Sequence, residues 1–135
     1  MWTFQKTSSE LHFEQAWEWH EATPRFLRES CGFIKRDRFI EKLSSGVNYA
    51  GFEDGIYKSL VYGEIRGDNV VEGHLYTVRR TNLDFLIATI TFAKAEALKD
   101  YEKVIVELPV KHKMLHGMIL RAGFFDTGLA KFGKM

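Results

Sequence analysis

The stretch VIVELPVKHKMLHGMILRAGFFDTG, residues 104–128, places a strand, a helix and a turn in close succession. Residues 104–108 form a short apolar run, typical of a central strand that is covered on both faces. A helix over 111–122 follows, with Leu115, Met118 and Ile119 directed inward, and Gly123 suits the position after its last turn. The tail over 124–132 is expected to return as a strand. This end of the chain predicts strands and helices that alternate around one sheet.

The preceding residues extend the same pattern into a single α+β domain over residues 1–135. The run Thr7-Ser8-Ser9-Glu10 has the spacing of a capping box, which predicts where the first helix begins, and Pro24 is expected to end it. Hydrophobic periodicity and turn-forming residues define the other elements. In order, we expect a strand over 1–5, a helix that begins at the run 7–10 and ends near Pro24, and a helix over 35–43. Strands over 47–52, 56–66 and 70–78 and a long helix over 82–100 follow.

Length and composition exclude several classes of function. The chain has 135 residues, of which 45% are hydrophobic, enough for one well-buried core. Its 19 basic and 18 acidic residues give a net charge of +1, so neither a nucleic acid nor a membrane is expected as a partner. The single cysteine, Cys31, allows no internal disulfide, and no apolar leader is evident. A cytoplasmic protein is expected.

The strand over 70–78 carries the first candidate site. Alternation along it places Glu72, His74 and Tyr76 on one face, so polar-tipped side chains share that side. The strand, helix and strand from residue 75 to residue 106 predict a right-handed parallel crossover. Ligands of open sheets favour the carboxyl ends of parallel strands and the adjoining helix N-terminus. We therefore expect a pocket near residues 78–84 and 109–112.

This order of elements, together with the ending quoted above, resembles the GNAT family of acyl-CoA-dependent N-acyltransferases. Members commonly end a central strand, start a helix at an asparagine, carry a tyrosine late in that helix and finish at Gly-Phe. Gly123-Phe124 matches this pattern, whereas His112 stands where the asparagine is usual and Ile119 where the tyrosine would be. In the family that tyrosine often serves as general acid toward the leaving thiolate. The resemblance implies a mixed, mostly antiparallel central sheet flanked by helices, and transfer of an acetyl group from acetyl-CoA to an amine.

The family also holds the coenzyme A pyrophosphate on a glycine-rich loop between the fourth strand and the long helix. The corresponding piece here, TVRRTNLDFLIATI over residues 77–90, contains no glycine. The partly positive helix N-terminus remains, but Asp84 in its first turn would compete with a bound anion. Arg79 and Arg80 can compensate through their guanidinium groups, or they can simply form a solvated strand end. The resemblance implies these cofactor-binding residues: Leu75, Tyr76, Thr77, Val78, Arg79, Arg80, Asn82 and His112.

Glu72 and His74 are the expected catalytic residues. An amine arrives protonated, so acyl transfer to it needs a base near neutral pH. Some GNAT enzymes carry a glutamate on the fourth strand six residues before its last apolar residue, and Glu72 stands in that relation to Val78. His74 on the same face can share or replace the role because imidazole titrates near neutrality. Glu107 is a third option, and each of these residues also has an ordinary structural interpretation.

The remaining features leave two classes of function open. His112 and His116 share a helix face, but no third ligand is apparent, so no metal is expected. In the first class the protein is a divergent acetyltransferase acting on a small-molecule or peptide amine. In the second the fold is kept without the chemistry, as a binding or structural protein such as a phage or virion component. A homodimer or a macromolecular partner is compatible with both.

Overall fold

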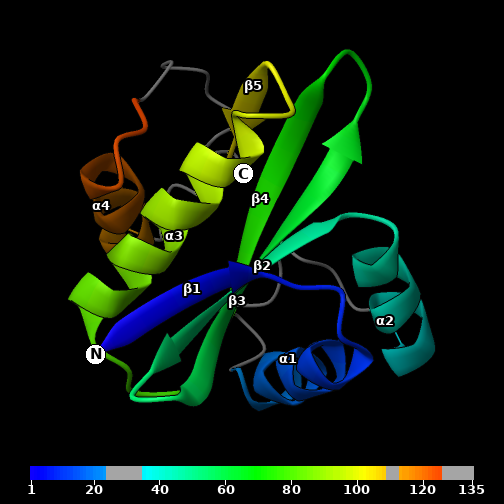
Figure 1. Cartoon of the computed structure of the whole chain (residues 1–135), viewed down its shortest axis with the longest axis vertical. Coiled ribbons are helices and arrows are strands. Elements are labelled where there is room, and N and C mark those ends of the chain that lie inside the picture. The colour runs from blue at the N-terminus through cyan, green and yellow to red at the C-terminus, as the bar shows by residue number, and fades with distance from the viewer. Residues whose placement is uncertain (24–34, 109–112, 126–135) are drawn as a thin grey trace.

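The computed structural model describes residues 1–23, 35–108 and 113–125. Its elements follow the predicted order, with two helices after the first strand, then three consecutive strands, a long helix, a strand and a helix (Figure 1). The His112 position and the expected strand over 124–132 lie wholly or largely outside the described residues. The elements are β1 (Trp2–Lys6), α1 (Glu10–Ala22), α2 (Arg36–Ser44), β2 (Val47–Glu53), β3 (Ile56–Arg66), β4 (Val70–Thr77), α3 (Leu83–Ala97), β5 (Lys103–Ile105) and α4 (Lys113–Arg121).

The described strands form one sheet in the order β1-β2-β3-β4-β5. Strands β1 to β4 pair antiparallel, and β5 pairs with β4 in parallel. The two predicted turns are tight: Asp54 and Gly55 join β2 to β3, and Asp68 and Asn69 join β3 to β4, all at positive φ. The predicted α+β architecture with a mixed, mostly antiparallel sheet is confirmed.

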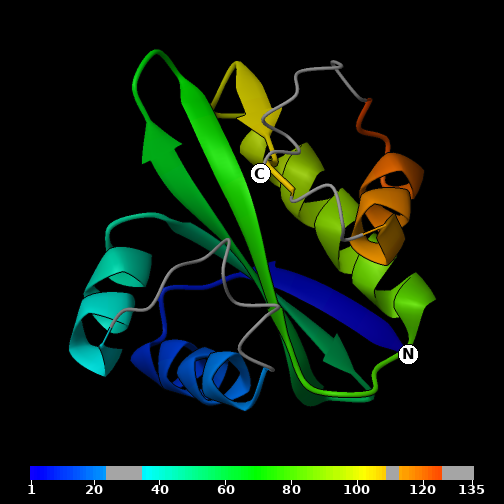
Figure 2. The ribbon, with the colours of Figure 1, turned by 180° about the vertical axis from the view of Figure 1, so that it is seen from behind.

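Helices cover both faces of the sheet, as Figures 1 and 2 show from opposite sides. On one face α1 and α2 bury a cluster that includes Phe13, Phe39 and Leu60. On the other face α3 and α4 bury a cluster that includes Phe85 and Ile119. The sheet is therefore the middle layer of three. Across the ranges that the structure describes, no helix is long and apolar enough to cross a membrane.

Two local predictions were wrong. The capping box does not form, because the Ser9 side chain caps no amide of α1 and the Thr7 hydroxyl instead accepts a hydrogen bond from the Ser9 amide. The fifth strand is shorter than expected and ends at Ile105, and in the described part of the sheet it lies at the edge with half-buried side chains. The strand expected over 124–132, which would border it on the other side, lies largely outside the described residues.

Helix α3 approaches the sheet closely at Gly51 of β2. Ser59 and Thr89, both fully buried, join β3 to α3 through a hydrogen bond of 3.0 Å between their hydroxyl groups. A Cβ atom on Gly51 would lie 2.4 Å from the Ser59 hydroxyl and 2.8 Å from that of Thr89. Any side chain at this position would therefore push the helix away from the sheet or break the buried hydrogen bond.

We predict that Gly51→Ala lowers the free energy of unfolding by about 1–3 kcal/mol, the usual cost of overpacking a core. Gly67→Ala is the matched control, because a Cβ there meets nothing within 4 Å. Its effect should stay within about 0.5 kcal/mol. Urea unfolding of both variants measures the difference, and equal midpoints would show that the contact at Gly51 relaxes without cost.

Candidate functional site

Strands β4 and β5 pair over only three residues and then diverge. Their ladder joins Val70 to Lys103, Val71 to Val104 and Glu72 to Ile105, whereas β4 itself continues to Thr77. The Val78 amide donates to the Lys58 carbonyl of β3. Because peptide groups alternate along a strand, the amides of Gly73, Leu75 and Thr77 face the opposite way, toward the gap. Among the described strands none pairs with this side of β4 beyond Glu72. The gap therefore offers a row of backbone donors and acceptors.

The two faces of the sheet differ sharply beside this gap. Toward α1 and α2, the strand presents Glu72, His74 and Tyr76, as the alternation predicted. Tyr76 packs against His20 and Phe39 on this face. Toward α3 and α4, Val71 and Leu75 belong to or pack against the apolar cluster of that side. A polar cluster and an apolar layer therefore meet across one strand.

The polar cluster is assembled by the register between β3 and β4. Glu64 lies opposite Glu72, and Tyr62 lies opposite His74, on which its ring stacks with a centroid separation of 5.6 Å. The His74 Nε2 atom is buried and lies 3.5 Å from a carboxylate oxygen of Glu64 and 3.5 Å from one of Glu72. The other Glu72 oxygen accepts a hydrogen bond from Arg66. One imidazole thus sits between two carboxylates.

Burial governs the protonation of this cluster. It raises the pKa of Glu72, an effect that Arg66 opposes and that Glu107 and Glu64 reinforce. Burial also lowers the pKa of His74, whereas the nearby carboxylate of Glu64 acts to raise it. The desolvation is consistent with the exposure of the Glu72 residue, which is only 7%. At neutral pH His74 is therefore an uncharged imidazole that can accept a proton.

Ligand atoms of Glu64, Glu72 and His74 lie within 4.8 Å of one another, close enough to share a metal ion. Cations already neutralise both carboxylates, however. Arg66 pairs with Glu72, and Lys42 Nζ lies 4.0 Å from Glu64. A divalent ion would have to displace them. The cluster therefore holds an imidazole and two carboxylates close enough for their protonation to be coupled.

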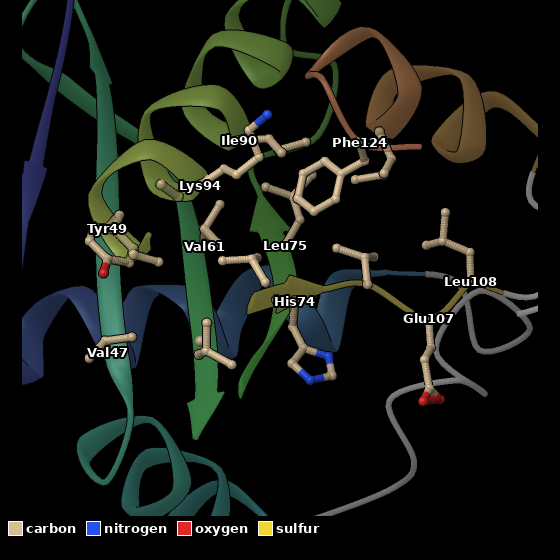
Figure 3. A pocket seen from close by; sticks show the side chains of 18 of the residues that line it. Val47, Tyr49, Val61, His74, Leu75, Ile90, Lys94, Glu107, Leu108 and Phe124 are labelled. Atoms are coloured by element: carbon tan, nitrogen blue, oxygen red, sulfur yellow. The ribbon is translucent and has the colours of Figure 1, made fainter. Parts of the chain in front are cut away.

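An apolar cavity of about 160 Å³ opens on the other face, between the sheet and helices α3 and α4 (Figure 3). Gly73 and Leu75 of β4 and Val106 and Leu108 after β5 line it at the gap. From α4 it receives the apolar side chain of Ile119. Figure 3 shows the His74 imidazole and the Glu107 carboxylate pointing away from the apolar side chains. His74 therefore borders the cavity, while its imidazole lies with the polar cluster on the other face of β4.

The N-terminus of α3 is occupied by the chain's own groups. The Asn82 side-chain oxygen accepts hydrogen bonds from the amides of Asp84 and Phe85, at 2.7 and 3.3 Å. These amides are the donors that a helix start offers to an anion. The Asp84 carboxylate in the same turn pairs with Arg121 of α4 at 3.0 Å. Asp84 is thus partly neutralised, which sequence reasoning did not anticipate.

The loop between β4 and α3 has other groups to offer an anion. Arg79 and Arg80 are both exposed, and Arg80 has a φ of 61°, in the left-handed region that non-glycine residues adopt at a cost of roughly 1 kcal/mol. The Thr81 hydroxyl is buried and has no hydrogen-bond partner within the described ranges. These three residues gather beside the carboxyl end of β4, where the pocket was expected.

The predicted site residues thus fall into separate groups. Glu72 and His74 lie together in the polar cluster, Leu75 lines the cavity, and Asn82 caps α3. Sequence reasoning missed Glu64 and Arg66, which complete the cluster from β3. The sequence could have predicted these residues from the tight turn over 67–69. An antiparallel pairing of β3 with β4 about that turn places residue 64 opposite residue 72.

Comparison by sequence identifies no relative: no protein-family model matches the chain, and no curated protein matches it. Solved structures do match. A chimera of the Vibrio cholerae spermidine N-acetyltransferase and hSSAT superposes with a TM-score of 0.73 at 12% identity, over 94% of this chain and 82% of that one. A GNAT-family acetyltransferase from Streptococcus pneumoniae gives 0.63 at 15%, over 93% and 88%.

An aminoglycoside N-acetyltransferase in complex with CoA gives a TM-score of 0.63 at 13% identity, over 100% of this chain and 95% of that one. Identities of this size establish a shared fold. Together with the parted strands β4 and β5 and the helices on both faces, these likenesses show that the chain has the fold of the GNAT acetyltransferases.

Proposed function

We propose that the protein is an acyl-CoA-dependent N-acyltransferase that modifies a small-molecule or peptide amine. One observation carries this proposal: β4 separates a buried carboxylate–imidazole cluster on one face from an apolar cavity on the other, at the point where β5 leaves it. A donor in the gap and an amine arriving from the α1 and α2 face would meet at Gly73. The neighbours of known structure include enzymes named for spermidine and aminoglycosides, both amines.

The donor side of the gap fits the pantetheine arm of coenzyme A. The amides and carbonyls of Gly73, Leu75 and Thr77 face the gap and would pair with the amide groups of that arm, as a neighbouring strand would. The apolar side chains of Leu75, Val106 and Leu108 would cover its carbon atoms. Bound acyl-CoA would supply an activated thioester whose carbonyl carbon accepts the amine.

The nucleotide end of the cofactor would be held in a different way. Because Asn82 already occupies two amides at the start of α3, the helix terminus offers less to the diphosphate than a glycine-rich loop does. The exposed guanidinium groups of Arg79 and Arg80 and the buried Thr81 hydroxyl are suited to grip it instead. We therefore expect weaker and more salt-dependent binding than a glycine loop gives.

His74 and Glu72 would act together on the acceptor. In the reaction an amide bond forms while the thioester C–S bond breaks, so the ammonium form of the amine must first lose a proton. His74, neutral through burial, would take that proton directly or through a water molecule. The carboxylates of Glu64 and Glu72, each 3.5 Å away, would stabilise the imidazolium that results. Glu72 thus assists His74, the base, whether or not Glu72 itself contacts the amine.

The leaving group does not require the missing tyrosine. An alkyl thiol has a pKa near 8.5, so a thiolate can depart at neutral pH and take its proton from water afterwards. Ile119, at the tyrosine position, contributes only apolar surface to the cavity. The proposed chemistry therefore depends on the residues that deprotonate the amine, His74 and Glu72.

A second function is favoured by one specific observation: two amides at the start of α3 are already hydrogen-bonded to the Asn82 side chain. The Asn82 cap and the Asp84 carboxylate together disfavour an anion at this terminus. A protein that keeps the fold as a binding or structural module, without coenzyme A, would show this arrangement. Direct titration of the cofactor separates the two functions.

Calorimetric titration at low salt should show coenzyme A and acetyl-CoA binding with micromolar affinity. Replacing Arg79 and Arg80 together by alanine should weaken coenzyme A about tenfold, because two guanidinium groups are lost. Pantetheine, which lacks the diphosphate, should bind this variant and the wild-type protein equally. The absence of binding at millimolar cofactor would exclude the enzyme and leave the binding module.

Asp84→Asn should tighten coenzyme A binding about two- to fivefold, because it removes a carboxylate from the first turn of α3 and frees Arg121. Asp37→Asn is the matched control, since Asp37 lies in the first turn of α2. The same calorimetric titration measures both variants. Unchanged affinity in Asp84→Asn would place the diphosphate away from α3.

The pH profile of kcat/KM tests the base. Its acid limb should lie below 6.5, the ordinary pKa of histidine, because burial lowers the pKa of His74 and activity is lost only when this residue becomes protonated. Glu72→Gln should reduce kcat/KM by roughly 10²-fold and move the limb to still lower pH, since a negative charge beside the imidazole is removed. The rate of coenzyme A thiol release, with spermidine or an aminoglycoside as acceptor, gives kcat/KM at each pH.

Glu96→Gln serves as the control for that experiment, because Glu96 pairs with Lys99 on the surface of α3. Its profile should match that of the wild-type protein. Unchanged turnover in Glu72→Gln would remove Glu72 from the mechanism, and an unchanged limb in that variant would show that His74 is not the titrating group.

A further inference from the structure

The cavity beside the parted strands is larger than an acetyl group needs. Its volume is about 160 Å³, close to that of an engineered apolar cavity of about 150 Å³ that binds benzene in another protein. An acetyl group beyond the thioester carbonyl adds a single methyl. The thioester end of the donor would take the part of this volume at the gap, and the part beneath α3 has room for a hydrocarbon tail of several carbons.

The cavity also extends past the point where the strands part. Gly73, Leu75 and Val106 line it at the gap, while Val47, Tyr49 and Ala97 line it further in, beneath α3. Figure 3 shows this extent, with Val47 and Tyr49 at one side and Leu108 at the other. The inner part lies behind the pair Val71 and Val104, where β4 and β5 are still joined. A group that only fills the gap would not reach it.

Small residues keep this inner space open. A Cβ atom on Gly73 would meet only Val106, at 3.7 Å, so the strand has free room on this side. Opposite the sheet, α3 presents Ala93 and Ala97, both buried. Larger side chains at these positions would fill the space between helix and sheet, as in an ordinary core. The hollow is therefore set by residue size.

The lining of the inner cavity is mostly apolar. Burial, reinforced by nearby acidic groups, raises the pKa of Tyr49 to about 12, so its hydroxyl stays neutral. Of the charged residues that line the space, Lys94 directs its ammonium group over the Phe124 ring at 5.4 Å, and Glu107 is exposed at the mouth. Such a lining suits a saturated hydrocarbon and excludes a polar or charged group.

We propose that this cavity binds the tail of an acyl group of about six carbons, so that the preferred donor is a medium-chain acyl-CoA. The inference rests on the proposed function, because the thioester must lie at the gap for its tail to enter the cavity. The thioester at Gly73 would then direct the chain beneath α3, toward Ala97 and Tyr49. Each methylene that leaves water should raise affinity up to fourfold.

Calorimetric titration with CoA, acetyl-CoA, butanoyl-CoA, hexanoyl-CoA and decanoyl-CoA tests this proposal. Hexanoyl-CoA should bind at least tenfold more tightly than acetyl-CoA, and decanoyl-CoA should gain nothing further because the cavity is then full. Hexanoyl-CoA binding no more tightly than acetyl-CoA would overturn the inference and leave the proposed function intact. A rise that continues to ten carbons would also overturn it, since the tail would lie outside the cavity.

Ala97→Leu identifies the binding place. A leucine there would fill the inner cavity, so the advantage of hexanoyl-CoA over acetyl-CoA should fall at least fivefold. Ala95→Leu is the matched control, because Ala95 is exposed on the same helix, and it should keep the full advantage. An undiminished advantage in Ala97→Leu would overturn the proposed location. Thermal melting checks the fold of each variant, and Gly73→Ala provides a second test from the sheet side.

Failure of the proposed function gives a different result. If neither CoA nor any acyl-CoA binds, the enzyme itself is excluded and this inference falls with it. Binding of CoA and acetyl-CoA without a gain from chain length excludes the medium-chain donor alone.

Discussion

The candidate site depends on one constraint, the hydrogen bonding of β4 beyond the residues that pair with β5 in the described part of the sheet. Backbone donors and acceptors that lose a partner strand inside a protein must find another partner, because burying them unpaired is costly. Three residue pairs hold the strands together, and from Gly73 onward one side of β4 faces a gap within the described sheet. Such a gap suits an extended ligand with amide groups of its own. The proposed donor site, the cavity beneath α3 and the polar cluster on the opposite face are all arranged around it.

The polar cluster shows how neighbouring side chains stabilise the buried carboxylate of Glu72. Glu72 is almost fully buried, yet Arg66 from the neighbouring strand donates to one of its oxygens and His74 lies beside the other. Burial without such partners would make Glu72 neutral, and removing Arg66 would leave a carboxylate without a compensating charge. An uncharged imidazole between two carboxylates is the proton acceptor that the proposed function requires.

The start of α3 is stabilised by polar groups of the chain itself. Asn82 caps the helix, Asp84 adds a negative charge, and Arg121 of α4 balances it. These contacts satisfy the helix terminus within the protein itself, as an ordinary N-cap does. They move any role in binding phosphate to side chains of the preceding loop, whose Arg80 adopts the left-handed backbone that glycine would adopt more easily. The fold is thus maintained by packing, while the proposed anion site would depend on a few polar groups.

The sequence by itself determined the order of elements, because hydrophobic period and turn residues act locally, and it correctly placed Glu72, His74 and Tyr76 on one face of β4. It did not determine the length of β5, the pairing of Asp84 with Arg121 or the cluster of Glu64, Arg66 and His74. Each of these depends on residues that meet only when strands and helices are assembled, and periodicity carries no information about such partners. The cavity likewise required the tertiary structure, since the small side chains of Gly73 and Ala97 become a hollow only when α3 lies over the sheet.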